Sequence, residues 1–352
     1  MIFKPYLQLM VDKRASDLYI SAGSLPQIRI EGRMVQIGKT PLSASTVNDG
    51  ILEIMNEREK TRFERSWEVD FSFEVGEIGR FRVAAFRQRG QTALVVRFVH
   101  PALPQIRELG LPLILQDLAI HRSGLILVVG PTGCGKSTTM AAMMQHRNES
   151  MSGHILTIED PIEFHLQSKL SIVNQRELGV DTASYAAALH SALRASPDVV
   201  MVGEVRDRVT MQAVMELSGT GHLCMATMHA NNAPQALDRI SSLFPPDHHK
   251  QLFLDLSLYL RAVVSQRLVT NKEGRRLAAV EIMINTPYVA ELVSLGNFGK
   301  LKAVMEESKA QGMQDIDTVL HEMYLEGSIS KEEVLANADS RANLEAKINF
   351  QG

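Results

Sequence analysis

The strongest constraint on the fold is a glycine-rich segment, Gly130-Pro131-Thr132-Gly133-Cys134-Gly135-Lys136-Ser137. It fits the pattern G-x-x-x-x-G-K-[ST] and stands between the apolar run 125–129 and a helix-like stretch that begins at Thr138. In such a loop, glycines let backbone N–H groups converge on a phosphate, and the following helix directs its positive end at the same anion. We therefore expect residues 130–138 to bind phosphate, with Lys136 reaching the β and γ phosphates and Ser137 offering its hydroxyl to Mg²⁺.

Short apolar segments alternate with helix-like stretches beyond residue 112. These segments are 125–129, 155–158, 199–202 and 223–226. Uninterrupted apolar strands are typical of a parallel sheet that is covered on both faces. We therefore predict an α/β domain over residues 113–352, with a mostly helical C-terminal part from Gln251 onward and a mobile tail over 337–352.

The first hundred residues follow another pattern. Apolar and polar residues alternate over 69–75, the run 92–99 is rich in β-branched residues, and 47–63 has helical spacing. These features predict a small α+β domain with an antiparallel sheet over residues 1–100. Prolines at positions 101, 104 and 112 discourage regular structure, so we place a linker over 101–112.

Composition excludes several other classes of protein. With 37 Lys or Arg and 40 Asp or Glu, the formal net charge is −3, which suits neither a general nucleic-acid coat nor a DNA motor with a basic channel. No apolar run reaches the roughly 18 residues of a spanning helix. Cys134 and Cys224 are too few for a disulfide scaffold or a four-cysteine zinc site. We expect a cytoplasmic protein that has no transmembrane segment and binds no nucleic acid.

Two acidic clusters follow the phosphate loop along the chain. Glu159, Asp160 and Glu163 lie at the end of an apolar strand, where doubly wound folds place their ligands. Glu204 follows the run 199–202 in the manner of a Walker B acid, which reaches the metal or the water opposite the γ-phosphate. Taken singly, each cluster would be interpreted as a charged group at a strand end. Their order after one phosphate loop favours a catalytic site.

Two histidines, His222 and His229, bracket the apolar stretch 223–228. We expect both imidazoles at the ligand edge of the sheet, in contact with phosphate or with the acidic cluster. A zinc site is the other functional interpretation, but a strand separates the two side chains, which fits zinc poorly. In the loop itself, Cys134 is interpreted as a space-filling residue, with redox sensitivity as the alternative.

The order of these motifs resembles the secretion ATPase superfamily, the ring motors of type IV pili and type II secretion. Within it, the sequence is similar to the PilT/PilU branch of pilus-retraction motors. The resemblance extends from Ala15-Ser16-Asp17-Leu18 and 79–83, through the phosphate loop and the acidic clusters, to 220–239. It implies an N-terminal PAS-like domain, a C-terminal RecA-like P-loop ATPase domain, and a homo-hexamer that hydrolyses ATP with Mg²⁺.

The resemblance also implies roles for residues of the phosphate loop and the acidic clusters. Lys136 would clamp the phosphates, and Ser137 and Glu204 would be the magnesium ligands. Glu163 would be the catalytic carboxylate that orients water, beside Glu204 as the Walker B acid.

Histidines and arginines complete the set that the resemblance implies. His229 and His222 would form the His box at the nucleotide. Arg82 and Arg97 match the N-terminal-domain arginines that approach the nucleotide in this superfamily. Solvation of these two side chains on the outer face of the sheet is the alternative.

Two absences and one departure select a branch of the superfamily. Extension and secretion motors usually carry an additional N-terminal domain and a tetracysteine zinc motif, and we expect neither here. After Asn285-Thr286-Pro287, where PilT-like proteins continue with an Ala-Ile-Arg helix, the chain continues with Tyr288-Val289-Ala290-Glu291-Leu292. This departure favours a PilU-like accessory to a PilT-type ATPase in pilus retraction and twitching motility. The implied further partner is an inner-membrane pilus platform protein, and the implied location is cytoplasmic, peripherally associated with the inner membrane at the pilus base. A catalytically idle ring adaptor and a principal PilT-type motor are the alternatives.

Overall fold

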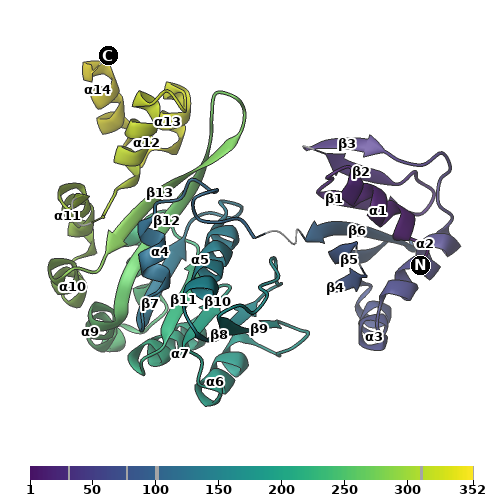
Figure 1. The fold of residues 1–352 in the computed structure, drawn as a ribbon, viewed down its shortest axis with the longest axis horizontal. Helices are drawn as coiled ribbons and strands as arrows, with labels where there is room; N and C mark the ends of the chain where they lie inside the picture. Colours follow the sequence, from purple (N-terminus) through teal and green to yellow (C-terminus); the bar gives the residue numbers. More distant parts are fainter. Residues whose placement is uncertain (31, 77, 100–102, 310–311, 352) are drawn as a thin grey trace. The chain divides into compact units, whose positions relative to one another are not determined.

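The chain packs into two compact units, Met1–Ala102 and Leu103–Gly352 (Figure 1). The computed structural model describes residues 1–30, 32–76, 78–99, 103–309 and 312–351. Each unit has its own sheet. Within the described residues, no helix is both long enough and apolar enough to cross a membrane.

The first unit is an antiparallel sheet packed against helices. The strands are β1 Asp17–Ser21, β2 Gln27–Ile30, β3 Arg33–Gln36, β4 Glu68–Val75, β5 Gly79–Gln88 and β6 Gln91–Val99, in the order β3-β2-β1-β6-β5-β4. The helices are α1 Lys4–Asp12, α2 Ala44–Ile54 and α3 Glu57–Ser66. Leu7, Ile51 and Phe63 of the helices share one core with Leu18 and Phe81 of the strands. The expected α+β character of this region is confirmed.

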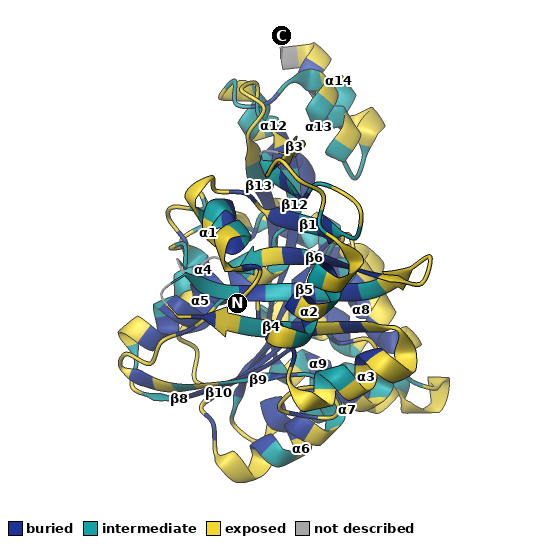
Figure 2. Cartoon of the chain, turned by 90° about the vertical axis from the view of Figure 1, so that its right-hand side faces the viewer, coloured by how far each residue is buried: buried dark blue, intermediate teal, exposed yellow. Residues whose placement is uncertain are grey.

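The second unit is built on a seven-stranded sheet. Its strands are β7 Gly124–Val129, β8 Gly153–Glu159, β9 Ser171–Glu177, β10 Val199–Val202, β11 Leu223–Met228, β12 Leu260–Thr270 and β13 Arg276–Ile284, in the order β13-β12-β7-β11-β10-β8-β9. All neighbouring pairs are parallel except β12 and β13. Every residue of β7, β10 and β11 is buried, which explains why their sequences are apolar apart from Thr227. Figure 2 colours the chain by burial.

Helices cover both faces of this sheet. They are α4 Ile114–Ala119, α5 Lys136–Ser150, α6 Tyr185–Ala195, α7 Arg208–Gly219, α8 Ala233–Ser242, α9 His249–Tyr259, α10 Pro287–Ser294 and α11 Leu301–Glu307. Successive β7 residues point to opposite sides. Leu125 and Leu127 join the core under α6 to α11, whereas Ile126 and Val128 join the core under α4 and α5.

The helices expected from Gln251 onward are present, because Gln251 lies within α9 and further helices follow β13. The expectation missed one long antiparallel pair, β12 and β13, in which β-branched residues such as Val263 and Val264 are buried. The expectation of a mobile tail is wrong. The tail forms α14 Arg341–Gln351, whose Leu344 and Ile348 pack in a small core with α12 Ile316–Leu325 and α13 Lys331–Asn337. Their four-residue spacing places both side chains on one helix face.

The segment expected as a linker is partly embedded in the second unit. Residues 101 and 102 lie outside the described residues. No helix or strand is present over 103–113, in keeping with the prolines, but Ile106 and Leu111 are buried in the core that α4 and α5 cover.

The parallel strands determine where the polar motifs meet. Because β7, β8, β10 and β11 all run in one direction, their carboxyl ends lie at one edge of the sheet. The phosphate loop follows β7, the two acidic clusters follow β8 and β10, and His229 follows β11. Ligands of doubly wound folds bind at this edge.

Candidate active site

The phosphate loop begins where β7 ends and leads directly into α5. Gly130, Gly133 and Gly135 have φ angles of 152°, 79° and 90°, a region that favours glycine. Lys136, the first residue of α5, donates hydrogen bonds from Nζ to the carbonyl oxygens of Gly130 at 2.8 Å and Pro131 at 3.0 Å. The ammonium group therefore lies over the loop, beside the helix N-terminus that attracts anions.

A buried glutamine on β12 supports the loop from below. The side-chain amide of Gln266 donates to the carbonyl oxygen of Cys134 at 2.6 Å and accepts from the Thr139 hydroxyl at 2.6 Å. A Cβ atom at Gly130 would lie 2.4 Å from the Gln266 carbonyl oxygen, so this close approach also needs glycine. Sequence reasoning missed Gln266, although a polar residue within a buried strand is a usable signal.

Cys134 is buried, and burial raises the pKa of its thiol. A buried thiol that stays protonated reacts slowly. These properties support a space-filling role in the loop.

The first acidic cluster contains one buried and one exposed glutamate. Glu159 ends β8 and is buried, and its carboxylate accepts from the Thr157 hydroxyl at 2.6 Å and from the Gln175 amide at 3.0 Å. Burial raises the pKa of Glu159, against the lowering effect of these hydrogen bonds. Glu163 is exposed at the cavity described below, with Asp160 between them in the chain. The two glutamates thus differ in their access to a ligand.

The second acidic cluster is an ion-pair network around Glu204. One carboxylate oxygen lies 2.9 Å from Nε2 of His229, and the other accepts a hydrogen bond from Nε of Arg206 at 2.8 Å. Thr227, which precedes His229 by two residues, donates from its hydroxyl to the Gly203 carbonyl oxygen. The strand ends of β10 and β11 are therefore linked at the site. Arg206 was not among the predicted site residues.

These groups surround one cavity of about 500 Å³, within the roughly 300–1,000 Å³ of ligand sites. It is lined by Thr132, Gly133, Gly135, Lys136, Ser137, Thr138, Met140, Glu159, Asp160, Pro161, Glu163, Tyr185, Met201, Gly203, Glu204, Arg206, Thr227 and His229. The loop, both acidic clusters and one histidine of the sequence analysis therefore come together. Gly130, Pro131 and Cys134 belong to the loop but do not line the cavity.

His222 lies away from this cavity. It precedes β11, at the amino end of the strand, and its Nδ1 is 3.1 Å from both the Leu217 carbonyl oxygen and the Thr220 hydroxyl. The expectation that both imidazoles lie at the ligand edge of the sheet is therefore wrong for His222. A parallel strand brings only the residue after it to that edge, and here that residue is His229.

Arg82 and Arg97 are neighbours on the sheet of the first unit. They face each other in the register of β5 and β6, and Arg97 also lies opposite Asp17 of β1. Nε of Arg97 lies 2.9 Å from a carboxylate oxygen of Asp17, and the Ser16 hydroxyl donates to the other oxygen at 2.8 Å. Asp17 is only 3% exposed, whereas the Arg97 side chain is 63% exposed. The anionic partner that explains an arginine on this strand is thus in the same unit.

The donor set at the cavity fits a nucleotide with Mg²⁺. Lys136 and the loop offer cationic and N–H groups to phosphates, and Ser137 and Glu204 offer hard oxygen ligands. Among the described residues, no cluster of three or more His, Cys, Asp or Glu side chains could hold a metal alone. Mg²⁺ usually binds one or two protein oxygens together with phosphates and water, so this arrangement suits it.

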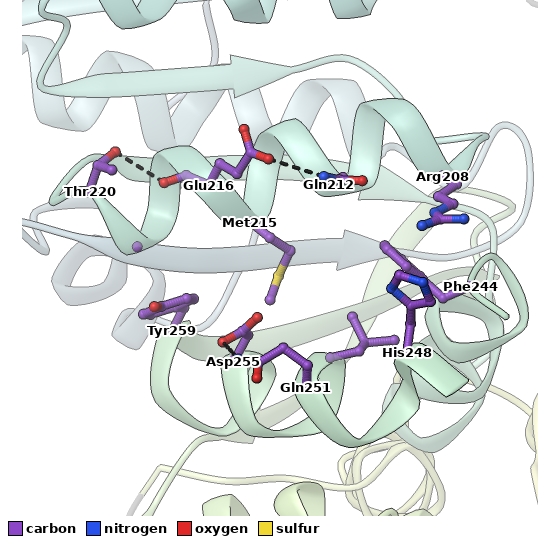
Figure 3. A pocket seen from close by; sticks show the side chains of 12 residues that line it. Arg208, Gln212, Met215, Glu216, Thr220, Phe244, His248, Gln251, Asp255 and Tyr259 are labelled. Atoms are coloured by element: carbon purple, nitrogen blue, oxygen red, sulfur yellow. Dashed lines mark hydrogen bonds between the residues drawn. The ribbon is translucent and has the colours of Figure 1, made fainter. Parts of the chain in front are cut away.

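A second cavity of about 410 Å³ lies between α7 and α9 (Figure 3). Met215 and Leu252 line it together with polar groups such as Gln212, Glu216 and Asp255. It contains neither a glycine-rich loop nor the acidic clusters, so it does not offer the chemistry of the first cavity.

Comparisons with known proteins show the family to which the chain is related. The model of the type II/IV secretion system protein family matches residues 1–336. The type IV pilus ATPase PilU of Pseudomonas aeruginosa is 46% identical over 351 residues, which cover 99% of this chain and 92% of the relative. The type IV pilus retraction ATPase PilT of the same organism is 40% identical over 330 residues, which cover 94% and 95%. A crystal structure of the pilus retraction motor PilT with bound ADP superposes with a TM-score of 0.93, at 36% identity and 98% and 99% coverage.

Proposed function

This chain belongs to the type II/IV secretion system protein family, and we propose that it is an ATP-hydrolysing motor subunit for type IV pilus retraction. It acts as a PilU-like accessory to a PilT-type motor, and through pilus retraction it takes part in twitching motility. The observation that carries the proposal is the single cavity in which Lys136, Glu163, Glu204 and His229 meet at the phosphate loop. The high similarity to both PilU and PilT over nearly the whole chain supports the same conclusion.

Binding of MgATP is the first step of the proposed mechanism. The loop and Lys136 would hold the β and γ phosphates, and Ser137 and Glu204 would hold a magnesium ion, which would supply positive charge to the phosphates. Lys136, which lies over the loop carbonyls at 2.8 and 3.0 Å, exchanges these neutral partners for anionic phosphate oxygens.

Hydrolysis then requires an oriented water more than covalent chemistry from the protein. Glu163 is exposed at the cavity and orients this water as the catalytic carboxylate. Arg206 and His229 hold the Glu204 carboxylate in place from two sides. Arg82 and Arg97 of another subunit supply positive charge to the phosphates, since the Asp17 contact engages Nε of Arg97 and leaves the rest of the exposed guanidinium for a ligand.

The motor works as a homo-hexamer in which nucleotide binds between subunits. It acts with a PilT-type ATPase on an inner-membrane pilus platform protein and associates peripherally with the membrane at the pilus base. This assembly is the one that the resemblance to retraction motors implies. His222 lies at the opposite end of β11 from the cavity of its own chain. Its proposed contact is therefore with the nucleotide of a neighbouring subunit.

Steady-state ATP hydrolysis by the purified chain tests the catalytic part of the proposal. We expect Lys136→Ala and Glu204→Gln to lower kcat by at least about a hundredfold, as for the loss of a preorganised charged group. Lys250→Ala is a matched control, because Lys250 is an exposed lysine of α9 that lines neither cavity. Full turnover by either site variant would refute the assigned site.

Pilus retraction in cells tests the biological part. A strain that lacks this gene is complemented with the wild type or with Lys136→Ala, in the presence and absence of the PilT-type partner. We expect the wild type to restore full retraction force only when the partner is present, and Lys136→Ala to fail. Restoration by Lys136→Ala would show an idle adaptor, and retraction without the partner would show a principal motor.

A further inference from the structure

Tyr185 is a residue of the nucleotide cavity that no motif marks. It is the first residue of α6, after Ser184, whose hydroxyl caps the helix by accepting from the Ala187 N–H at 3.1 Å. The cap fixes the direction in which the helix starts. The tyrosine then lines the cavity together with Asp160, Glu204 and Arg206.

Gly203 makes room for the tyrosine hydroxyl. A Cβ atom at position 203 would lie 2.9 Å from the Tyr185 hydroxyl oxygen and 3.2 Å from the Ile158 carbonyl oxygen. A Cβ contact under 3.0 Å is essentially never seen, so the tyrosine hydroxyl in this position requires a glycine at 203. The hydroxyl therefore lies against the residue that immediately precedes Glu204.

The Tyr185 hydroxyl is protonated at neutral pH, as an ordinary phenol is. Burial raises the pKa of Tyr185 above its ordinary value, and the negative charges of Asp160 and Glu204 raise it further, against Arg206. A protonated phenol can donate one hydrogen bond, whereas the neighbouring carboxylates can only accept. In the part of the chain that the structure describes, this hydroxyl has no hydrogen-bond partner, so its donor is available to a bound water.

We propose that Tyr185 is a positioning residue for ATP hydrolysis: through a bound water, its hydroxyl donates to the carboxylates of Asp160 and Glu204 and fixes their orientation at the nucleotide. The inference rests on the proposed ATPase site and adds a residue to it. In the hydrolysis that these carboxylates serve, the water oxygen bonds to the γ-phosphorus as the bond to the ADP oxygen breaks. The proton of the water passes to the released phosphate.

The variant Tyr185→Phe tests this role, because it removes one oxygen and keeps the half-buried ring. We expect kcat for ATP to fall about tenfold, which corresponds to about 1.4 kcal/mol. KM for ATP and the affinity for a fluorescent ATP analogue should stay within about twofold, since the loop and Lys136 hold the phosphates. A residue that only supports the fold would not separate kcat from KM in this way.

The matched control is Tyr259→Phe, which removes a hydroxyl at the other cavity (Figure 3). It should keep both kcat and KM, and the melting temperatures of the two variants and the wild type should agree within about two degrees, as expected for a change well below 1 kcal/mol. Wild-type kcat in Tyr185→Phe, or a loss confined to KM or to melting temperature, would overturn the proposal. Lys136→Ala separates this failure from a failure of the proposed function, because its full activity would refute the site itself.

Discussion

The buried carboxyl of Glu281 makes a quantitative prediction about stability. Glu281 lies on β13, and its side chain accepts a hydrogen bond of 2.8 Å from the N–H of Ala233, the first residue of α8. The pKa of Glu281 is raised from 4.5 to about 7, chiefly by burial and to a smaller extent by the nearby Asp339, against the lowering effects of the Ala233 N–H and Arg267. The folded protein therefore holds this proton more tightly than the unfolded chain does.

The sign of the pH dependence follows from this difference. Between pH 4.5 and pH 7 the folded state binds more protons than the unfolded state, so the free energy of unfolding falls as pH rises. A rise of the pKa from 4.5 to about 7 corresponds to a loss of about 3 kcal/mol that is complete above pH 7. Glu281→Gln keeps a carbonyl oxygen for Ala233 and cannot ionise. We expect the variant to be more stable than the wild type by about 3 kcal/mol at pH 8 and by less than about 1 kcal/mol at pH 5.

Urea unfolding of both proteins at pH 5 and pH 8, without nucleotide, measures this difference. The comparison cancels the titration of all other groups that the substitution leaves unchanged. Glu291→Gln, an exposed glutamate of α10, is the control for the change of charge and should show no such pH dependence. A Glu281→Gln advantage that does not grow from pH 5 to pH 8 would refute the reasoning.

Two further changes test contacts that support the site and the arginine pair. Gln266→Ala removes both amide hydrogen bonds under the phosphate loop, and we expect MgATP affinity to fall about tenfold, as measured with a fluorescent ATP analogue; unchanged affinity would contradict this support. For the ion pair of the first unit, Arg97→Ala should lower the free energy of unfolding by about 2 kcal/mol and Asp17→Asn by less than about 1 kcal/mol, because only the former leaves a buried charge without its partner. The opposite order in urea unfolding would show that Asp17 is not stabilised by Arg97.

The parts of the fold that sequence reasoning predicted are those set by local pattern. Apolar runs in the second unit became the inner strands, because burial on both faces of a sheet strongly favours apolar residues. The glycines and Lys136 of the loop were predictable, since phosphate binding dictates their spacing. Glu204 and His229 came together because both follow parallel strands.

The errors have physical causes too. His222 and His229 bracket the same strand, but the polarity of a parallel strand sends them to opposite edges. The helical prediction from Gln251 onward missed β12 and β13, although buried β-branched residues such as Val263 and Val264 fit a strand better than a helix. Tyr185 could not be found from spacing, since only the packing of α6 against Gly203 brings it to the cavity.

The strands that sequence reasoning missed also carry the supports of the site. On β12, Ser265 donates to the Asn231 carbonyl oxygen at 2.8 Å, and Gln266 next to it donates to the Cys134 carbonyl oxygen. On β13, directly opposite Ser265 in the register, Glu281 accepts from Ala233. The phosphate loop and the segment between His229 and α8 are thus attached to one antiparallel pair of strands. A shift of this pair relative to β7 would move both loops together, so β12 and β13 connect the phosphate-binding side of the cavity with its histidine side.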